Sequence, residues 1–182
     1  MVHIVGISGS LRRASCNTGI LRALAKSLPT GHTLDIVVPD LPLFNSDLEL
    51  PQSVKDFRAR LKRADAFIFA TPEYNYSISS PLKNALDWGS RGDADGNLFN
   101  DKAGATVSAG GMSGGMRATL HLADAAVYLN LHLLNHPQLP LKIFENPSPF
   151  DKDGNLIDEK AIEAHKKLLE AFLTWHTRIA RK

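Results

Sequence analysis

The stretch Val2-His-Ile-Val-Gly-Ile-Ser-Gly-Ser-Leu-Arg-Arg-Ala-Ser-Cys-Asn-Thr18 joins an apolar run, a polar loop and the start of a helical pattern. The continuous apolar character of residues 2–7 is typical of a strand buried on both faces, as in a parallel sheet. Ser15 or Asn17 can cap the helix that follows, whose apolar face extends to Leu28. The stretch therefore predicts a strand, a loop and a helix, which is the repeating unit of an α/β protein.

The same alternation continues along the chain. Further strands are predicted over residues 34–38, 66–70, 103–109 and 131–134. Further helices are predicted to begin at Ser53 and near Pro81. Another contains Leu120, Ala123, Ala126 and Val127, and the last spans residues 157–179. We expect a single domain over residues 1–182, a flavodoxin-like three-layer sandwich. Its five-stranded parallel sheet has the order 2-1-3-4-5, with helices on both faces.

Composition narrows the choice of partners. The 182 residues are 43% hydrophobic and 22% charged, which is ordinary for a globular protein. The formal charge of +2 argues against a dedicated nucleic-acid binder, and no apolar run reaches the roughly 18 residues of a membrane span. The single Cys16 cannot form an internal disulfide, and the first residues read as a strand instead of a signal peptide. We therefore expect a cytoplasmic protein.

Ligands of open parallel sheets bind beyond the carboxyl ends of the strands, where the strand order reverses. The first loop there, residues 8–18, combines hydroxyls, the guanidinium groups of Arg12 and Arg13, and a helix N-terminus. Such a loop favours a monophosphate, although its Ser, Asn and Thr side chains could equally serve only as helix caps. The chain lacks the glycine patterns of nucleoside-triphosphate and dinucleotide loops.

Two further loops face the same edge of the predicted sheet. In residues 71–77, two tyrosines flank polar groups, which suits the polar edge of a flat heterocycle or, alternatively, a proline-initiated turn with an aromatic anchor. Residues 110–115 are rich in glycine and let the backbone approach a ligand closely, or form a flexible connection. The only internal echo, Asp93-Ala-Asp-Gly-Asn97 against Asp151-Lys-Asp-Gly-Asn155, predicts two ordinary Asx turns.

These motifs together resemble a known family. The matching segments are Gly6-Ile-Ser-Gly-Ser-Leu-Arg12, Ser15-Cys-Asn17, Thr71-Pro-Glu-Tyr-Asn-Tyr-Ser77, Leu82-Lys-Asn-Ala-Leu-Asp-Trp88 and Ser90-Arg91. In this order they are similar to the NADPH-dependent FMN reductase family, and within it to soluble quinone and chromate reductases. Two departures are Ser79-Ser80-Pro81, where many members have Pro-Gly, and Cys16, where an aromatic residue is common.

The resemblance implies FMN, held tightly but without a covalent bond. It implies that the flavin phosphate is bound by Arg12, Ser15, Asn17 and Thr18. It places Pro72, Glu73, Tyr74 and Asn75 along the isoalloxazine, with Ser108 near its edge. Ser10 and Gly111, from the first and third loops, complete the predicted cofactor-binding residues. No side chain is assigned a catalytic role and no metal is expected, because the cofactor carries the chemistry.

The reaction implied is a ping-pong cycle. NADPH or NADH passes hydride to N5 of FMN, and a quinone then takes the same place and accepts two electrons. Azo compounds, chromate and free flavin are further acceptors of such a site. The resemblance also implies a homodimer or homotetramer, with Arg117 as a candidate interface or pocket residue.

Two other functions follow from different features. Cys16 and Arg22 have the C-x5-R spacing of low-molecular-weight phosphatases, in which a thiolate at a helix N-terminus is the nucleophile. Alternatively, the protein could be a non-enzymatic flavin electron carrier, although such carriers tend to be strongly acidic and this chain is nearly neutral.

Overall fold

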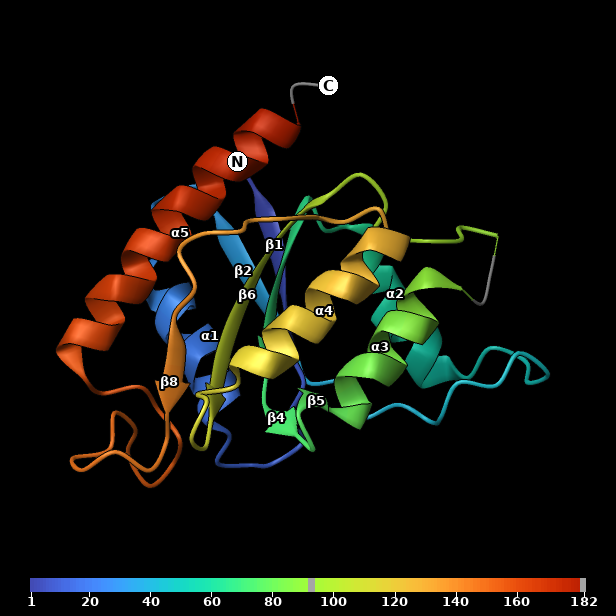
Figure 1. Ribbon diagram of the computed structural model, residues 1–182. Helices are drawn as coiled ribbons and strands as arrows, with labels where there is room; N and C mark the ends of the chain where they lie inside the picture. The colour runs from blue at the N-terminus through green and yellow to red at the C-terminus, as the bar shows by residue number, and fades with distance from the viewer. Residues whose placement is uncertain (92–93, 181–182) are drawn as a thin grey trace.

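The computed structural model describes residues 1–91 and 94–180, and a parallel sheet forms its centre (Figure 1). The long strands are β1 (His3–Ser8), β2 (Thr33–Val37), β3 (Ala66–Thr71) and β6 (Ala103–Gly110). Two short strands, β7 (His132–Leu133) and β8 (Pro140–Lys142), lie beside β6. The order is β2-β1-β3-β6-β7, and each of these pairs is parallel. The predicted flavodoxin-like order 2-1-3-4-5 is therefore confirmed.

The fifth position of the sheet differs from the single strand predicted over residues 131–134. β7 pairs with the first two residues of β6, whereas β8 pairs with its last three. Pro137 lies between the two short strands and Pro140 opens the second, and proline has no N–H to donate to a sheet. This edge of the sheet is therefore divided between two strands, and β8, at the carboxyl end of β6, is not among the predicted strands.

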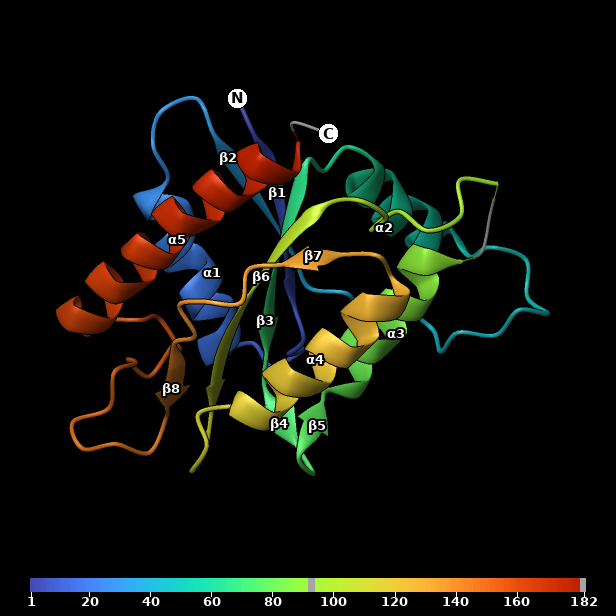
Figure 2. The same ribbon diagram turned by 45° about the horizontal axis from the view of Figure 1, so that its top comes forward.

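The helices cover both faces of the sheet (Figure 2). One face is covered by α1 (Cys16–Ser27) and α5 (Glu159–Ile179), and the other by α2 (Gln52–Lys62), α3 (Ser80–Ser90) and α4 (Met116–Tyr128). Along β3, Phe67 and Phe69 pack toward α2 and α3, whereas Ile68 packs toward α1 and α5. Among the described residues, no helix combines the length and apolarity needed to cross a membrane.

Side-chain caps determine where two helices beside the carboxyl edge begin. The Ser15 hydroxyl accepts a hydrogen bond from the Thr18 N–H at 3.2 Å, so Ser15 and not Asn17 caps α1. Ser79 caps α3 by accepting from the Leu82 N–H. Both predicted helix starts are thus close to the observed ones. Each capping serine fixes a helix N-terminus next to a loop at the end of a strand.

Of the four apolar residues expected in α4, Ala126 is buried and the other three are exposed. Leu120 and Val127 are 52% and 82% exposed, and Ala123 is also exposed. The buried residues of this helix are Ala118, Thr119, Leu122 and Ala126. Apolar residues occur on most sides of α4, so their spacing does not identify the face that meets the sheet.

The segment predicted as a loop after β3 contains a small hairpin. Its strands are β4 (Glu73–Tyr74) and β5 (Ser77–Ile78), which pair antiparallel. Asn75 and Tyr76 connect them with φ angles of 49° and 65°, as the two central residues of a type I′ turn require. Asparagine tolerates this left-handed region well, whereas tyrosine rarely adopts it.

Candidate functional site

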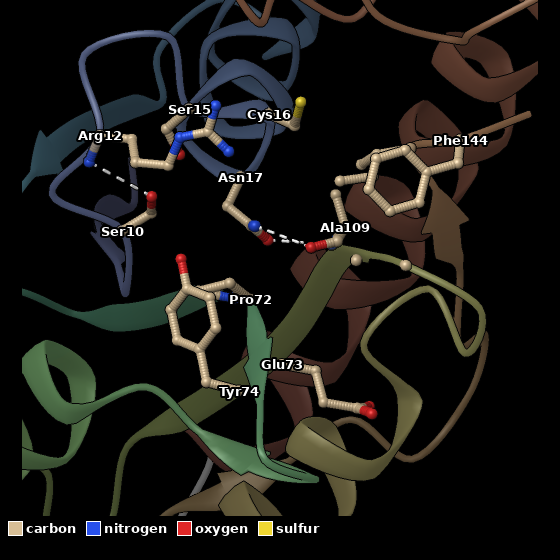
Figure 3. A pocket seen from close by; sticks show the side chains of 13 residues that line it. Ser10, Arg12, Ser15, Cys16, Asn17, Pro72, Glu73, Tyr74, Ala109 and Phe144 are labelled. Atoms are coloured by element: carbon tan, nitrogen blue, oxygen red, sulfur yellow. Dashed lines mark hydrogen bonds between the residues drawn. The ribbon is translucent and has the colours of Figure 1, made fainter.

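A cavity of about 290 Å³ lies beyond the carboxyl ends of β1, β3 and β6, where the strand order reverses (Figure 3). It is lined by Ser10, Arg12, Ser15, Cys16, Asn17, Pro72, Glu73, Tyr74, Ala109, Gly110, Gly111, Ile143 and Phe144. The three loops singled out in the sequence therefore meet at one cavity. We call the part formed by the first loop and the start of α1 the anion end.

The anion end presents hydrogen-bond donors. The exposed guanidinium of Arg12 lies beside Ser15 at the first turn of α1, and none of the described residues accepts a hydrogen bond from it (Figure 3). The N–H groups of Cys16 and Asn17 belong to the first turn, which has no acceptors within the helix. Ser10 is buried, and its hydroxyl accepts the Arg12 N–H at 3.4 Å. The Arg12 guanidinium and the N-terminus of α1 thus both direct hydrogen-bond donors into the anion end of the cavity.

Asn17 links the anion end to the sheet. Its side chain is buried, and its Nδ2 donates to the Ala109 carbonyl oxygen at 2.9 Å. Its Oδ1 accepts the Ala109 N–H, also at 2.9 Å. This reciprocal pair attaches the first turn of α1 to the end of β6, so the predicted binding residue is also a structural tie.

Thr18 and Ser108, both predicted to bind the cofactor, do not line this cavity. The Thr18 and Ser8 hydroxyls share a hydrogen bond of 2.8 Å below the first loop. Ser108 is buried beneath Gly115, where an added Cβ would lie 2.7 Å from the Ser108 Cβ. The structure therefore does not bring either hydroxyl to the cavity wall.

Glu73 reaches away from the cavity, although its residue forms part of the wall (Figure 3). Its Oε2 accepts the Ser113 hydroxyl at 2.7 Å and the Arg117 N–H at 2.9 Å, and its Oε1 accepts from Arg117 Nη1 at 3.2 Å. Because the N-cap of α4, Gly115, has no side chain, Glu73 serves as the cap of that helix. Burial opposes ionisation of Glu73, but the hydrogen bonds from Ser113 and Arg117 outweigh it and lower its pKa.

Glu73→Gln should lower the free energy of unfolding by about 1 kcal/mol near neutral pH, because the helix loses a charged cap. A carboxyl whose pKa is lowered by folding stabilises fully above its unfolded value, here 4.5, and loses that contribution as the pH falls through the folded value. The difference between the two proteins should therefore shrink below about pH 4.5. Urea unfolding at several pH values measures this, and a difference that grows in acid would contradict the assignment.

A second, wider cavity of about 590 Å³ adjoins the first and shares Glu73 and Gly111 with it. Its other lining residues are Asn75, Tyr76, Met112, Ser113 and Arg117. The Arg117 guanidinium carbon lies 4.0 Å from the centre of the Tyr76 ring, so a cation–π contact supports the uncommon backbone of this turn. The predicted residue Asn75 and the candidate Arg117 therefore lie in this second cavity.

Several lining residues carried no signal in the sequence. Ile143 and Phe144 follow β8, a strand that was not predicted, and Phe144 is 82% exposed. Met112 and Ser113 belong to the glycine-rich third loop, but nothing in their pattern distinguishes them from the residues of a plain connection.

The phosphatase hypothesis is not supported by the geometry. Arg22 does not line the cavity; its Nε donates to Asn155 Oδ1 at 2.9 Å on another side of α1. Burial raises the pKa of the Cys16 thiol, more than the nearby Arg12 lowers it. A phosphatase nucleophile requires the opposite, a thiolate facing an arginine fork.

Comparisons with known proteins agree with this geometry. The sequence model of the NADPH-dependent FMN reductase family matches residues 2–146. The chain is 46% identical to the "Probable NADPH:quinone oxidoreductase 2" of Oryza sativa subsp. japonica, covering 100% of this chain and 92% of the relative. It is 38% identical to an NAD(P)H-dependent FMN reductase of Pseudomonas aeruginosa, covering 98% and 97%.

A solved structure is also similar along the whole chain. It is the flavoenzyme NAD(P)H:(acceptor) oxidoreductase from Paracoccus denitrificans, with a TM-score of 0.84 and 27% identity. The similarity covers 98% of each chain. Fold, cavity and sequence together lead to one conclusion: the chain belongs to the NADPH-dependent FMN reductase family.

Proposed function

We propose that this protein is an NAD(P)H:quinone oxidoreductase that holds FMN tightly and without a covalent bond. The observation that carries the proposal is the pairing of an anion end with an adjoining, wider cavity at the carboxyl edge of the sheet. The quinone reductases among the relatives support the choice of acceptor.

The donors at the anion end fit a flavin phosphate. Arg12 supplies charge, and the first N–H groups of α1 supply backbone donors directed at the same space. Ser10 and Ser15 line that end, with Ser15 already capping the helix. Asn17 fixes the position of these donors relative to the sheet through its two hydrogen bonds with Ala109.

The rest of the first cavity fits a flat ring. Pro72 and Tyr74 line this cavity, and so do Gly110 and Gly111, where the backbone itself forms the wall because glycine has no side chain. At Gly110 an added Cβ would lie 2.9 Å from the Gly115 N, so a side chain would displace the loop that shapes this wall. The residues present therefore suit FMN.

Bound FMN supplies the group that accepts hydride from NADPH or NADH and then delivers two electrons to a quinone. The second cavity adjoins the first and would give both partners one place beside a ring bound there, which supports a ping-pong cycle. There, Arg117 is held by Glu73 and stacked on Tyr76, and its positive charge suits the phosphates of the nicotinamide nucleotide. The protein's task is to bind, orient and exclude water.

We also infer a homodimer or homotetramer in the cytoplasm, formed from one domain per chain. The exposed apolar side chains of Leu120, Val127 and Tyr128 on α4 support association. The lone Cys16 suits a reducing compartment.

Steady-state oxidation of NADPH and NADH, with FMN supplied, tests the proposal. The purified protein alone should oxidise at least one nicotinamide and reduce a quinone, with the parallel double-reciprocal lines of a ping-pong cycle. A protein that binds FMN but turns over neither nicotinamide would instead be an electron carrier. No described cluster of His, Cys, Asp or Glu is arranged to hold a metal, and a chelator should leave the rate unchanged.

A further inference from the structure

The turn Asp151–Asn155 is held together by its first side chain. Asp151 Oδ1 accepts the N–H groups of Asp153 and Asn155 at 2.9 and 2.8 Å, and its Oδ2 accepts from Asn155 Nδ2 at 3.0 Å. The flanking residues Phe150 and Leu156 pair with each other and are buried in the core beneath α1 and α5. The predicted Asx turn is therefore present here as a closed and anchored unit. Its echo begins at Asp93, which lies outside the described residues.

This turn packs backbone against backbone on the anion end. A Cβ added at Gly19 in α1 would lie 1.8 Å from the Gly154 carbonyl oxygen. A Cβ added at Gly154 would lie 2.8 Å from the carbonyl carbon and oxygen of Ala14. Gly154 also has a φ of 75°, which other residues rarely adopt. The close approach leaves the end of the first loop little freedom to move away from the turn.

A side-chain contact joins the same two segments. Arg22, one helical turn after Gly19, donates from Nε to Asn155 Oδ1 at 2.9 Å and from Nη2 to the Asp153 carbonyl oxygen at 3.4 Å. Asn155 thus uses its oxygen for α1 and its nitrogen for Asp151. The arginine of the rejected phosphatase motif ties α1 to the turn.

The first loop needs such support. Leu11, Arg12 and Arg13 are exposed, so little packing holds them in place. On the sheet side, the start of α1 is held by the Asn17–Ala109 pair, and the turn holds its other side. The turn lies beyond residues 2–146, to which the family model is matched.

We propose that the Asp151–Asn155 turn is a brace that positions the first loop for the flavin phosphate, with Asn155 and Arg22 as positioning residues. The proposal rests on the proposed function, since it requires FMN at the anion end. Its physical basis is preorganisation: a loop already held in its binding shape loses less entropy when the phosphate arrives. None of residues 151–155 lines the cavity, whereas the turn packs on the first loop and α1, so the brace should act on the binding of the phosphate.

The test compares FMN with riboflavin, which lacks the phosphate, by fluorescence titration of the full chain. Asn155→Ala should raise the Kd of FMN about tenfold, as for one lost hydrogen bond to a charged group, and leave that of riboflavin within about twofold. Arg22→Gln should act similarly. In the double variant, the rise in the Kd of FMN should be smaller than the product of the two single effects, because both substitutions remove the same Arg22–Asn155 hydrogen bond. If Asn155→Ala does not fold, Arg22→Gln alone tests the proposal.

Asn97→Ala is the matched control. Asn97 is the last residue of the sequence echo and makes two hydrogen bonds of its own, to the Leu129 carbonyl and from the Phe99 N–H, away from the cavity. The ratio of the two flavin affinities should not change in this variant. An unchanged ratio in both Asn155→Ala and Arg22→Gln would overturn the brace while leaving the proposed function intact. A wild-type protein that bound no FMN would overturn both.

Discussion

Asn17→Asp is expected to lower the free energy of unfolding by about 3 kcal/mol and to weaken FMN binding about 100-fold. The native amide both donates to and accepts from Ala109, and a carboxylate cannot donate. One carboxylate oxygen would face the Ala109 carbonyl oxygen in a buried place, and its charge would repel the phosphate. Urea unfolding and flavin titration measure the two effects.

The pH dependence of the Asn17→Asp protein has a definite sign. Burial beside a carbonyl raises the pKa of the introduced carboxyl in the folded state, so the neutral acid is favoured there and can donate to Ala109. The deficit in stability should therefore be greatest at neutral pH and shrink as the pH falls toward about 4. A deficit that stays constant across this range would contradict the reciprocal pair.

Asn84→Asp provides a matched control. Asn84 is also buried, donating to the Leu41 and Pro42 carbonyls and accepting the Phe44 N–H, but it lies on α3 and not at the cavity. This variant should lose a similar amount of stability and keep its affinity for FMN. Equal loss of affinity in both variants would mean that reduced stability alone explains the effect.

Arg12→Ala is expected to raise the Kd of FMN about 100-fold at low salt, because a charged fork facing the phosphate is lost. The Kd of riboflavin should stay nearly constant. The Kd of FMN in Arg12→Lys should lie between those of the wild type and of Arg12→Ala, since lysine keeps the charge but not the paired N–H donors of a guanidinium. Arg13→Ala is the control, because Arg13 is also exposed but does not line the cavity. Equal effects at the two arginines would indicate general electrostatic attraction and contradict the role assigned to Arg12.

Much of the fold could be predicted because strands buried on both faces have a clear pattern. Residues 66–70 are apolar throughout, and the structure shows why: Phe67 packs toward one layer of helices and Ile68 toward the other. Short elements held by tertiary contacts carry no such pattern. β8 is three residues long, and Tyr76 in the hairpin turn stacks on Arg117, which is 41 positions away in the sequence.

The candidate site was predicted best where a local motif forms the wall. Arg12 and Ser15 sit on the first loop, and Tyr74 sits on the second, so sheet topology brings them together. Thr18 and Ser108 have equally suitable hydroxyls, but their backbone positions turn them into the fold. Phe144 reaches the cavity through a strand that the sequence did not reveal, which no local pattern could indicate.

The most direct measurement of the central claim is titration of the flavin-free protein with FMN, followed by anaerobic addition of NADPH or NADH. We expect saturation at one FMN per chain, with quenched flavin fluorescence, and then bleaching of the visible absorbance that a quinone restores. Flavin that stays fluorescent and free in solution at these concentrations would show that the cavity between the three loops is not a flavin site.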